Sequence, residues 1–584
     1  MPPALYRIFA LAFALALANQ AIADETPLPD IDGLMRAGVG VTRDDTPFFA
    51  YVPRENSAAA GSKLRILLVG GVEARSSTRQ AIIDALRWFQ ELKKSGDLAF
   101  DPTQFSLAGL PAPGPATGHS YPPTEGYHSP TKSNQAYLWN WIGMHAPDLV
   151  VVVNVATEPK LAGDIYIPKN CEALDPLRKS IQPALRLFSD DDLVAQLASG
   201  RPAGMGSIPA IGITVEEGKS AKEVERVLKL LAAAKYSGPS PARAELVRRQ
   251  SRSAKQVISD LLPHYGQNLN EVAYIPIMPL LARLDLAEQS GDASYREHVE
   301  KVAADFLSGK KTQAIKSGSE MAGYLLFSEL AKRAEGDKKT AVIRLVRSAA
   351  DLCFDDKGQP REIAPFHNEM SDAVFMSGPI LAAAGRLTGE PKYYEACLRH
   401  TENMLKLVVR DDGLCRHSPL CEAAWGRGNG FAALGLALTL DDFPVDHPGR
   451  ARLEVASCRH LRALLKHQDP DGSWHQVVDE PGSYRELSAT CMITFAMLRG
   501  IRAGRLSKEE FQPTIDRAWL AILARVGPNG QLVDVCTGTG KQKTLRDYYD
   551  RPAIFGPDPR GGGMALLVAV EKGRQSSKDS AAPP

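Results

Sequence analysis

Six short segments in the C-terminal half of the chain combine His, Trp, Arg, Asp and Gly at or just before the start of predicted helices. These residue types suit a carbohydrate ligand, because flat aromatic rings stack on sugar faces and arginine binds a carboxylate through two parallel hydrogen bonds. Glycine lets the backbone approach a ligand closely. The segments are residues 367–372, 416–419, 424–430, 471–476, 484–488 and 537–540. Together they predict a concave carbohydrate site built from the ends of several helices.

The candidate residues in these segments also have ordinary structural explanations. Asp372 precedes an apolar helix and fits a helix N-cap. Trp425 and Trp474 fit core aromatics, and His417, which precedes Ser-Pro, fits a turn residue. Residues 536–540 (Cys-Thr-Gly-Thr-Gly) lack the preceding strand and the GxxxxGK[ST] spacing of a phosphate loop, which argues against nucleotide binding.

Ordered motifs along residues 260–573 resemble glycoside hydrolase families 88 and 105, the unsaturated uronyl hydrolases. They are Met-Ser-Asp-Ala-Val-Phe-Met at 370–376, Ala-Trp-Gly-Arg-Gly-Asn at 424–429, Gly-Ser-Trp-His-Gln at 472–476, Glu-Leu-Ser-Ala-Thr at 486–490, Cys-Thr-Gly-Thr-Gly at 536–540 and Gly-Pro-Asp-Pro-Arg-Gly-Gly-Gly at 556–563. The resemblance implies an (α/α)6 toroid and favours functional roles for Asp372, His417, Trp425 and Arg427. His367, Trp474 and His475 complete the predicted substrate-binding set.

The resemblance also implies an unusual hydrolysis. The substrate carries a 4,5-unsaturated uronic acid at its non-reducing end; an Asp protonates C4, water adds at C5, and the resulting hemiketal opens and expels the remaining sugar. Asp372 matches the catalytic Asp of these families, and we expect burial and the substrate carboxylate to raise its pKa. The nearest acid in the loop that supplies the second family carboxylate is Glu320, a departure from Asp. No cofactor and no metal are implied.

The pattern of apolar residues divides the chain in two. Apolar runs at 64–69, 149–153 and 208–215 predict buried strands, and 80–92 and 134–144 have helical spacing. Residues 236–242, rich in Gly and Pro, predict a linker. Twelve helical segments follow, at 242–262, 271–290, 293–308, 318–335, 338–355, 371–388, 391–408, 420–440, 449–468, 483–503, 507–527 and 560–573. They favour six helical hairpins closed into a toroid, with an open solenoid as the alternative.

The N-terminal half has a weaker resemblance, to zinc carboxypeptidases. The strand ending near residue 69 leads into the place of that family's metal motif, but Glu73 and Ser76 stand there, and Asn154 stands at the third ligand position. Glu216 matches the position of the family's catalytic Glu. Loss of these ligands removes most of the metal affinity. We therefore predict a multidomain chain: a metal-free, carboxypeptidase-like α/β sandwich at 35–235, a toroid at 242–573 and a disordered tail at 574–584.

Composition and the N-terminus limit the partners and the compartment. The chain has 584 residues, 44% of them hydrophobic, with 69 basic against 68 acidic side chains, so no excess of positive charge suggests nucleic acid. A short apolar run and the small residues around Ala23 predict a signal peptide at 1–23; an uncleaved anchor is the alternative. We predict a periplasmic or secreted protein without a membrane span after cleavage.

These inferences converge on an exported glycoside hydrolase whose partner is an unsaturated oligosaccharide. Unsaturated galacturonyl-rhamnose is the leading substrate and an unsaturated glucuronyl oligosaccharide the alternative. A non-catalytic carbohydrate-binding toroid is the competing hypothesis, because Glu320 departs from the family pattern.

Overall fold

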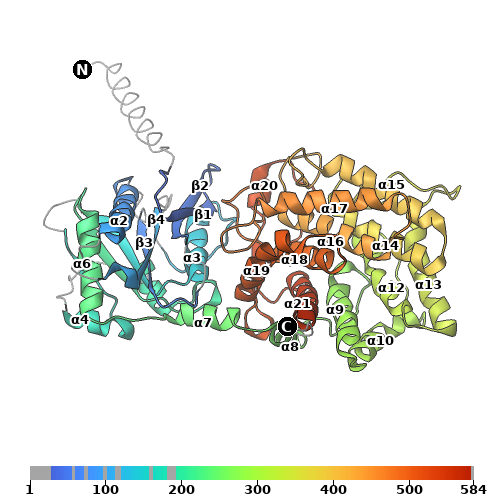
Figure 1. The fold of residues 1–584 in the computed structure, drawn as a ribbon, viewed down its shortest axis with the longest axis horizontal. Coiled ribbons are helices and arrows are strands. Elements are labelled where there is room, and N and C mark those ends of the chain that lie inside the picture. The colour runs from blue at the N-terminus through green and yellow to red at the C-terminus, as the bar shows by residue number, and fades with distance from the viewer. Residues whose placement is uncertain are drawn as a thin grey trace, which may run out of the picture.

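A computed structural model describes residues 28–54, 59–70, 76–95, 101–111, 120–156, 162–180 and 192–579 (Figure 1). Two bodies lie side by side, an N-terminal part built around a sheet and a larger helical part. The predicted signal peptide, Glu73 and residues 580–584 lie outside the described residues. No helix in the described ranges is long and apolar enough to cross a bilayer.

The N-terminal part holds a seven-stranded mixed sheet in the order β1-β2-β4-β3-β5-β7-β6. The predicted strands are confirmed as β3 (Leu64–Gly70), β5 (Leu149–Val155) and β7 (Ala210–Val215), which are paired in parallel in the order β3-β5-β7. The strands that the pattern did not reveal are β1 (Leu34–Val41), β2 (Pro47–Pro53), β4 (Phe105–Pro111) and β6 (Ile165–Tyr166). Arg and Gly interrupt the apolar run of β1, and Ser and Gly that of β4, which hid both strands from a search for continuous hydrophobicity.

Helices cover both faces of this sheet. Alternate residues of β3 enter different cores: Ile66 and Leu68 pack with α2 (Ser76–Ser95) and α6 (Ser220–Ala233), whereas Leu67 and Val69 pack with α3 (Ser133–His145) and α5 (Leu193–Ser199). The short helix α4 (Asp175–Ser180) completes the first layer. This is the two-period alternation of a strand buried on both sides. An α/β layer structure follows; its likeness to carboxypeptidases stays a prediction.

The predicted metal-ligand positions fall at the ends of these strands. Asn154 lies near the end of β5, and Glu216 follows β7 and pairs with Lys219 at 2.7 Å. Ser76 begins α2. Among the described residues no group of three or more His, Cys, Asp and Glu side chains could hold a metal ion.

The helical part is a closed ring. Its inner helices contact one another in the cycle α9-α11-α14-α16-α18-α21-α9, which excludes the open solenoid. They are α9 (Tyr274–Ser290), α11 (Gly318–Gly323) continued by α12 (Leu325–Ala331), α14 (Ala373–Thr388), α16 (Gly426–Asp442), α18 (Leu487–Arg502) and α21 (Pro559–Asp579). The outer ones are α8 (Ala254–Leu261), α10 (Ser294–Leu307), α13 (Gly336–Ala350), α15 (Pro391–Val408), α17 (Arg450–Leu465) and α19 (Lys508–Arg525).

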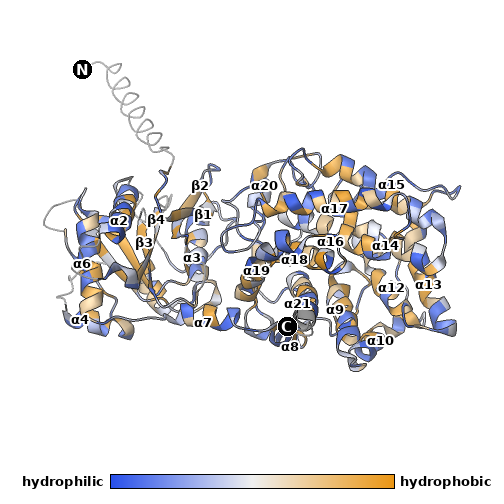
Figure 2. Cartoon of the chain, viewed as in Figure 1, coloured by the Kyte–Doolittle hydropathy of each residue, from blue (hydrophilic) through white to orange (hydrophobic). Residues whose placement is uncertain are grey.

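Side-chain size and polarity decide which helices lie inside. The first thirteen residues of α14 are all buried, with Ala, Gly and Ser allowing close approach of its neighbours. Figure 2 shows hydrophobic colour along β3 and β4 and mixed colouring on outer helices such as α10 and α13. An outer helix needs only one apolar stripe, because its other face meets water.

The structure differs from the predicted helical segments in three places. The first helical segment is split into α7 (Pro241–Gln250) and α8, because Ser253 caps α8 in a capping box with Gln256. The predicted tail begins inside α21, where the Gln575 amide donates to Gln512 at 2.6 Å. A two-stranded sheet, β8 (Leu532–Cys536) with β9 (Ala553–Gly556), and the short helix α20 (Leu545–Tyr549) stand between α19 and α21.

The predicted linker is firmly attached to the sheet domain. Asp148, fully buried, accepts a hydrogen bond from the Ser240 backbone at 3.0 Å and forms an ion pair with Arg243. One hydrophobic core continues from the sheet and α3 into the toroid. At Gly38 a Cβ would lie 1.8 Å from the Pro481 carbonyl oxygen, so only glycine permits this contact between the two parts.

Candidate active site

The starts of the inner helices meet at one end of the toroid, as the polar segments predicted. Asp372 immediately precedes α14 and Arg427 lies in the first turn of α16. A Cβ on Gly428 would lie 2.5 Å from the Ser371 hydroxyl, and one on Gly318 would lie 2.4 Å from the His367 ring nitrogen. These close approaches bring α11, α14 and α16 together at their N-terminal ends.

Asp372 and His417 form the centre of this site. The His417 Nε2 lies 3.2 Å from the Asp372 Oδ2, and both side chains are buried. The other ring nitrogen, Nδ1, lies 2.8 Å from the Tyr548 hydroxyl. The Gln542 backbone amide donates to the same hydroxyl, which leaves the Tyr548 proton free to donate to Nδ1. That arrangement leaves the His417 Nε2 protonated and facing the carboxylate.

The electrostatics of Asp372 correct one expectation. Burial is the largest single influence and opposes ionisation, but His417, His367 and Arg427 together outweigh it and hold the pKa of this carboxyl below its ordinary value. The expected rise of the pKa is therefore wrong for the unliganded protein. Asp372 is a carboxylate at neutral pH before substrate binds.

Arg427 and Trp425 are buried and lie in contact with each other beside His417. The Arg427 guanidinium donates to the carbonyl oxygens of Cys536 and Thr537, each at 2.6 Å, and lies 4.9 Å from the centre of the Trp425 ring. The Trp425 ring in turn contacts His417, with ring centres 4.5 Å apart. Arg427 thus joins α16 to residues 536–537, the start of the Cys-Thr-Gly-Thr-Gly segment. Its positive charge also lowers the pKa of Asp372.

His367 and Tyr274 are the less buried neighbours of this centre. His367 is half-buried, and burial lowers the pKa of its imidazole. Its backbone has a φ of 55°, a left-handed conformation that is uncommon outside glycine. Tyr274, the first residue of α9, packs edge-on against Phe375 and Phe431 and feels the charges of Arg427 and Asp372.

Glu320 makes hydrogen bonds at the start of α11. It is the third residue of α11; its backbone amide donates to the Ser317 hydroxyl, and its carboxylate accepts a hydrogen bond from the Lys316 amide. This pattern of reciprocal bonds caps the start of a helix. The structure therefore gives Glu320 a capping role, and its assignment as the second catalytic acid stays a prediction.

Trp474 and His475 are part of the framework. The Trp474 indole is fully buried and donates to the Leu464 carbonyl at 2.8 Å, so neither ring face is open to a sugar. His475 lies between Asp469, at 2.9 Å, and the Ser483 carbonyl, at 2.6 Å. Both were predicted to bind substrate; the structure shows them in contacts within the protein, and a role in substrate binding stays a prediction.

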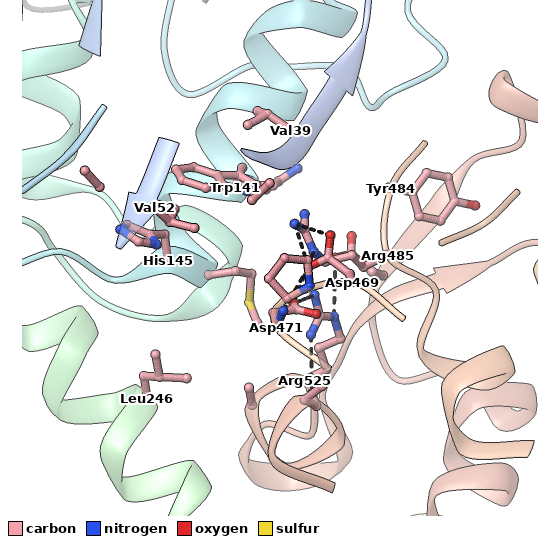
Figure 3. A pocket seen from close by; sticks show the side chains of 18 of the residues that line it. Val39, Val52, Trp141, His145, Leu246, Asp469, Asp471, Tyr484, Arg485 and Arg525 are labelled. Carbon is pink, nitrogen blue, oxygen red and sulfur yellow. Dashed lines mark hydrogen bonds and ion pairs between the residues drawn. The ribbon is translucent and has the colours of Figure 1, made fainter. Parts of the chain in front are cut away.

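A separate cavity of about 140 Å³ lies between the two parts of the chain (Figure 3). Trp141 and His145 stack on its sheet side, and on the toroid side Arg485 and Arg525 pair with Asp469 and Asp471. None of the residues around Asp372 described above lines it. It is a feature of the domain interface and not of the helix-start site.

Sequence reasoning missed Tyr548 and Tyr274. Tyr548 belongs to α20, which is five residues long and has no periodic pattern of its own. The paired tyrosines at 548–549, shortly after the Thr-Gly-Thr-Gly segment, were the available signal. The sequence signal for Tyr274 was weaker: it is an aromatic residue at the start of an inner helix.

Comparison with known proteins gives a family match in the helical part and several similar proteins. The profile described as Glycosyl Hydrolase Family 88 matches residues 278–575. The unsaturated rhamnogalacturonyl hydrolase YesR of Bacillus subtilis is 28% identical over 269 residues, which are 44% of this chain and 70% of that protein. The unsaturated 3S-rhamnoglycuronyl hydrolase of Formosa agariphila is 30% identical over 169 residues, 26% of this chain and 45% of that protein. A possible GH105 member from Salmonella enterica aligns with a TM-score of 0.48 at 23% identity, covering 55% of this chain and 94% of that one.

Proposed function

The chain belongs to Glycosyl Hydrolase Family 88, and from this premise we propose that it removes a 4,5-unsaturated uronic acid from the non-reducing end of an oligosaccharide. The names of its relatives support that substrate class. Unsaturated galacturonyl-rhamnose is the leading substrate, and an unsaturated glucuronyl oligosaccharide is the alternative with the same chemistry.

The observation that carries the proposal is the Asp372 carboxylate beside the His417 imidazole, at the point where the inner helices begin. The positive charge of Arg427 and the Nε2–H of His417 suit a ligand that brings its own carboxylate. When a uronate binds there, its negative charge offsets their effect and raises the pKa of Asp372. Substrate binding thereby supplies the protonated acid that the free protein lacks.

One carboxyl group can then carry out both proton transfers of the reaction. Asp372 gives its proton to C4 while the electrons of the double bond form the new C4–H bond, leaving positive charge shared between C5 and the ring oxygen. Water adds at C5 and returns a proton to Asp372, so the acid is regenerated. The hemiketal opens to a C5 ketone, the ring oxygen becomes a hydroxyl on C1, and C1 expels the remaining sugar as an alcohol.

A screen of lyase-generated oligosaccharides tests the proposal. Loss of the unsaturated-uronate absorbance with release of the saturated sugar is the expected result, with galacturonyl-rhamnose consumed fastest. A protein that retains these oligosaccharides but leaves the double bond intact is a carbohydrate-binding toroid, and the hydrolase proposal is then wrong.

For the N-terminal half we propose a metal-free carboxypeptidase-like packing module in an exported protein. The substituted ligand positions at Ser76 and Asn154 support the first part, and the apolar N-terminal run supports the second. Chelators are expected to leave hydrolysis unchanged, and N-terminal sequencing of the mature protein is expected to begin at Asp24. Tightly bound stoichiometric zinc contradicts the first part, and a retained Met1 contradicts the second.

A further inference from the structure

The turn between β1 and β2 contacts α20 through charged side chains. Arg43 donates to both carboxylate oxygens of Asp550, at 2.5 and 3.1 Å. Arg546 donates to the Thr42 carbonyl at 2.6 Å and pairs with Asp45. Two elements some 500 residues apart in sequence are thereby joined, one from the sheet domain and one from the toroid.

The turn is well suited to hold a neighbour because it is closed on itself. The Thr42 amide donates to the Thr46 carbonyl at 2.9 Å, and the Asp45 amide donates to the Thr42 carbonyl at 3.2 Å. Asp45 has a φ of 65°, which turns the chain sharply at that residue. The flanking β1 and β2 are paired along their length, so the turn is anchored in the sheet.

α20 is held on its inward side by the burial of Tyr548 and Tyr549, and on its outward side by this turn. Five residues are too few for a helix to be stable alone. Its start is capped by Thr544 and Asp547, and the Tyr548 carbonyl accepts the Gln476 amide at 2.7 Å. Neither contact restrains the outward side of the helix, where Arg546 and Asp550 lie one turn apart.

Tyr548 connects α20 to the catalytic centre. Its hydroxyl lies 2.8 Å from the His417 Nδ1, and the opposite ring nitrogen lies 3.2 Å from Asp372. A displacement of α20 moves this hydroxyl and with it the hydrogen bond that fixes the tautomer and direction of the imidazole.

We propose that the turn at residues 42–46 is a positioning element of the active site, acting through α20 and Tyr548 on His417 and Asp372. The proposal rests on the hydrolase function proposed above. It makes the sheet domain a working part of the enzyme, although the family profile begins only at residue 278. Arg43 and Asp45 are positioning residues: they touch no reacting group.

The test compares two variants of the full chain. Arg43→Gln with Asp45→Asn removes the charged contacts to α20, and Tyr127→Phe removes a buried bond between the same two parts, to Asp534 at 2.9 Å, without touching α20. We expect the double variant to lose about tenfold in kcat with KM within about twofold of wild type, since a small misplacement of a catalytic group slows turnover more than binding. Tyr127→Phe is expected to keep the wild-type kcat.

Two further measurements separate positioning from general docking. Arg43→Lys keeps the charge and is expected to retain most of the wild-type kcat. Labelled-histidine NMR, with His417 assigned through His417→Gln, reads the imidazole tautomer without any turnover. We expect a changed His417 tautomer ratio in the double variant and none in Tyr127→Phe.

The outcomes decide separately on the two proposals. Wild-type kcat and an unchanged His417 signal in the double variant overturn the positioning role. Equal effects in the double variant and in Tyr127→Phe overturn it as well, because they show only that the two parts must dock. A wild-type chain inactive on every unsaturated oligosaccharide refutes the hydrolase function, while the NMR comparison still decides whether the turn positions His417.

Discussion

Asp534 and Asp469 both face the cavity between the two parts of the chain, and we expect their neutralisation to have opposite effects on stability. Asp534 is 4% exposed; it accepts the Tyr127 hydroxyl, and Arg525 lies no nearer than 3.8 Å. Burial is the main influence and raises its pKa to about 6. Asp469 is as deeply buried, but Arg485 and His475 contact it directly and outweigh burial, so its pKa is lowered.

The pKa of Asp534 sets the size of the effect. Its carboxyl goes from an ordinary value of 3.8 to about 6 on folding. At about 1.4 kcal/mol per pKa unit, the ionised carboxylate costs the folded state about 3 kcal/mol. Because the folded pKa is the higher one, this cost is present in full above pH 6 and is relieved as the pH falls from 6 towards 4.

Asp534→Asn removes the charge and keeps the rest of the site. An amide oxygen still accepts the Tyr127 hydroxyl, and asparagine tolerates the positive φ of 62° at this residue. Arg525 keeps Asp471 as its partner at 2.9 Å. We expect the variant to be more stable than wild type at pH 8, by up to about 3 kcal/mol, with the difference reduced to about half of that at pH 5.

Urea unfolding at pH 8, 7, 6 and 5 measures this difference, with Asp469→Asn as the matched control. Asp469→Asn leaves Arg485 and His475 buried without their anion and is expected to destabilise the chain by about 3–5 kcal/mol at pH 7. If Asp534→Asn destabilises the protein at pH 8, or if its effect is the same at every pH, the reasoning from burial is refuted.

The remaining predictions concern catalysis. Asp372→Asn cannot deliver a proton and is expected to lose at least about 100-fold in kcat while still binding unsaturated oligosaccharide; normal turnover on a lyase digest would show that another group is the acid. Glu320→Gln keeps an acceptor for the Lys316 amide and is expected to retain activity within about threefold, and a dead variant would restore Glu320 as a catalytic acid. Arg427→Lys reaches only one of the two carbonyl oxygens that Arg427 binds, so kcat/KM is expected to fall about tenfold or more with the fold intact by circular dichroism; wild-type kinetics would limit Arg427 to a packing role.

The local pattern of apolar residues was enough to predict the main strands and helices of the chain. Continuous apolar runs located β3, β5 and β7, and helical periods located every helix of the ring, because a buried strand and an amphipathic helix each impose a period on neighbouring residues. The same pattern placed Asp372, His417 and Arg427 at or near helix starts that meet at one end of the toroid.

Contacts between distant residues decided the roles of the site residues, and no local period records them. Trp425 and Trp474 both stand in Gly-containing segments before predicted helices. Trp425 packs against His417, whereas the Trp474 indole donates a hydrogen bond to the Leu464 carbonyl. Glu320 and Asp372 both stand at helix starts, but the Glu320 carboxylate accepts a hydrogen bond from its own loop, whereas Asp372 lies beside His417.

The sequence by itself determined the class of enzyme, because the class depends on residue types in a fixed order, and it led to Asp372 as the proposed acid. The tertiary structure alone decided the charge state of Asp372, since that depends on how burial and the charges of His417, His367 and Arg427 sum at one point in space. The tertiary structure also brought the turn at residues 42–46 into contact with α20. These residues lie some 500 positions apart in the chain, so no local sequence pattern could predict the contact.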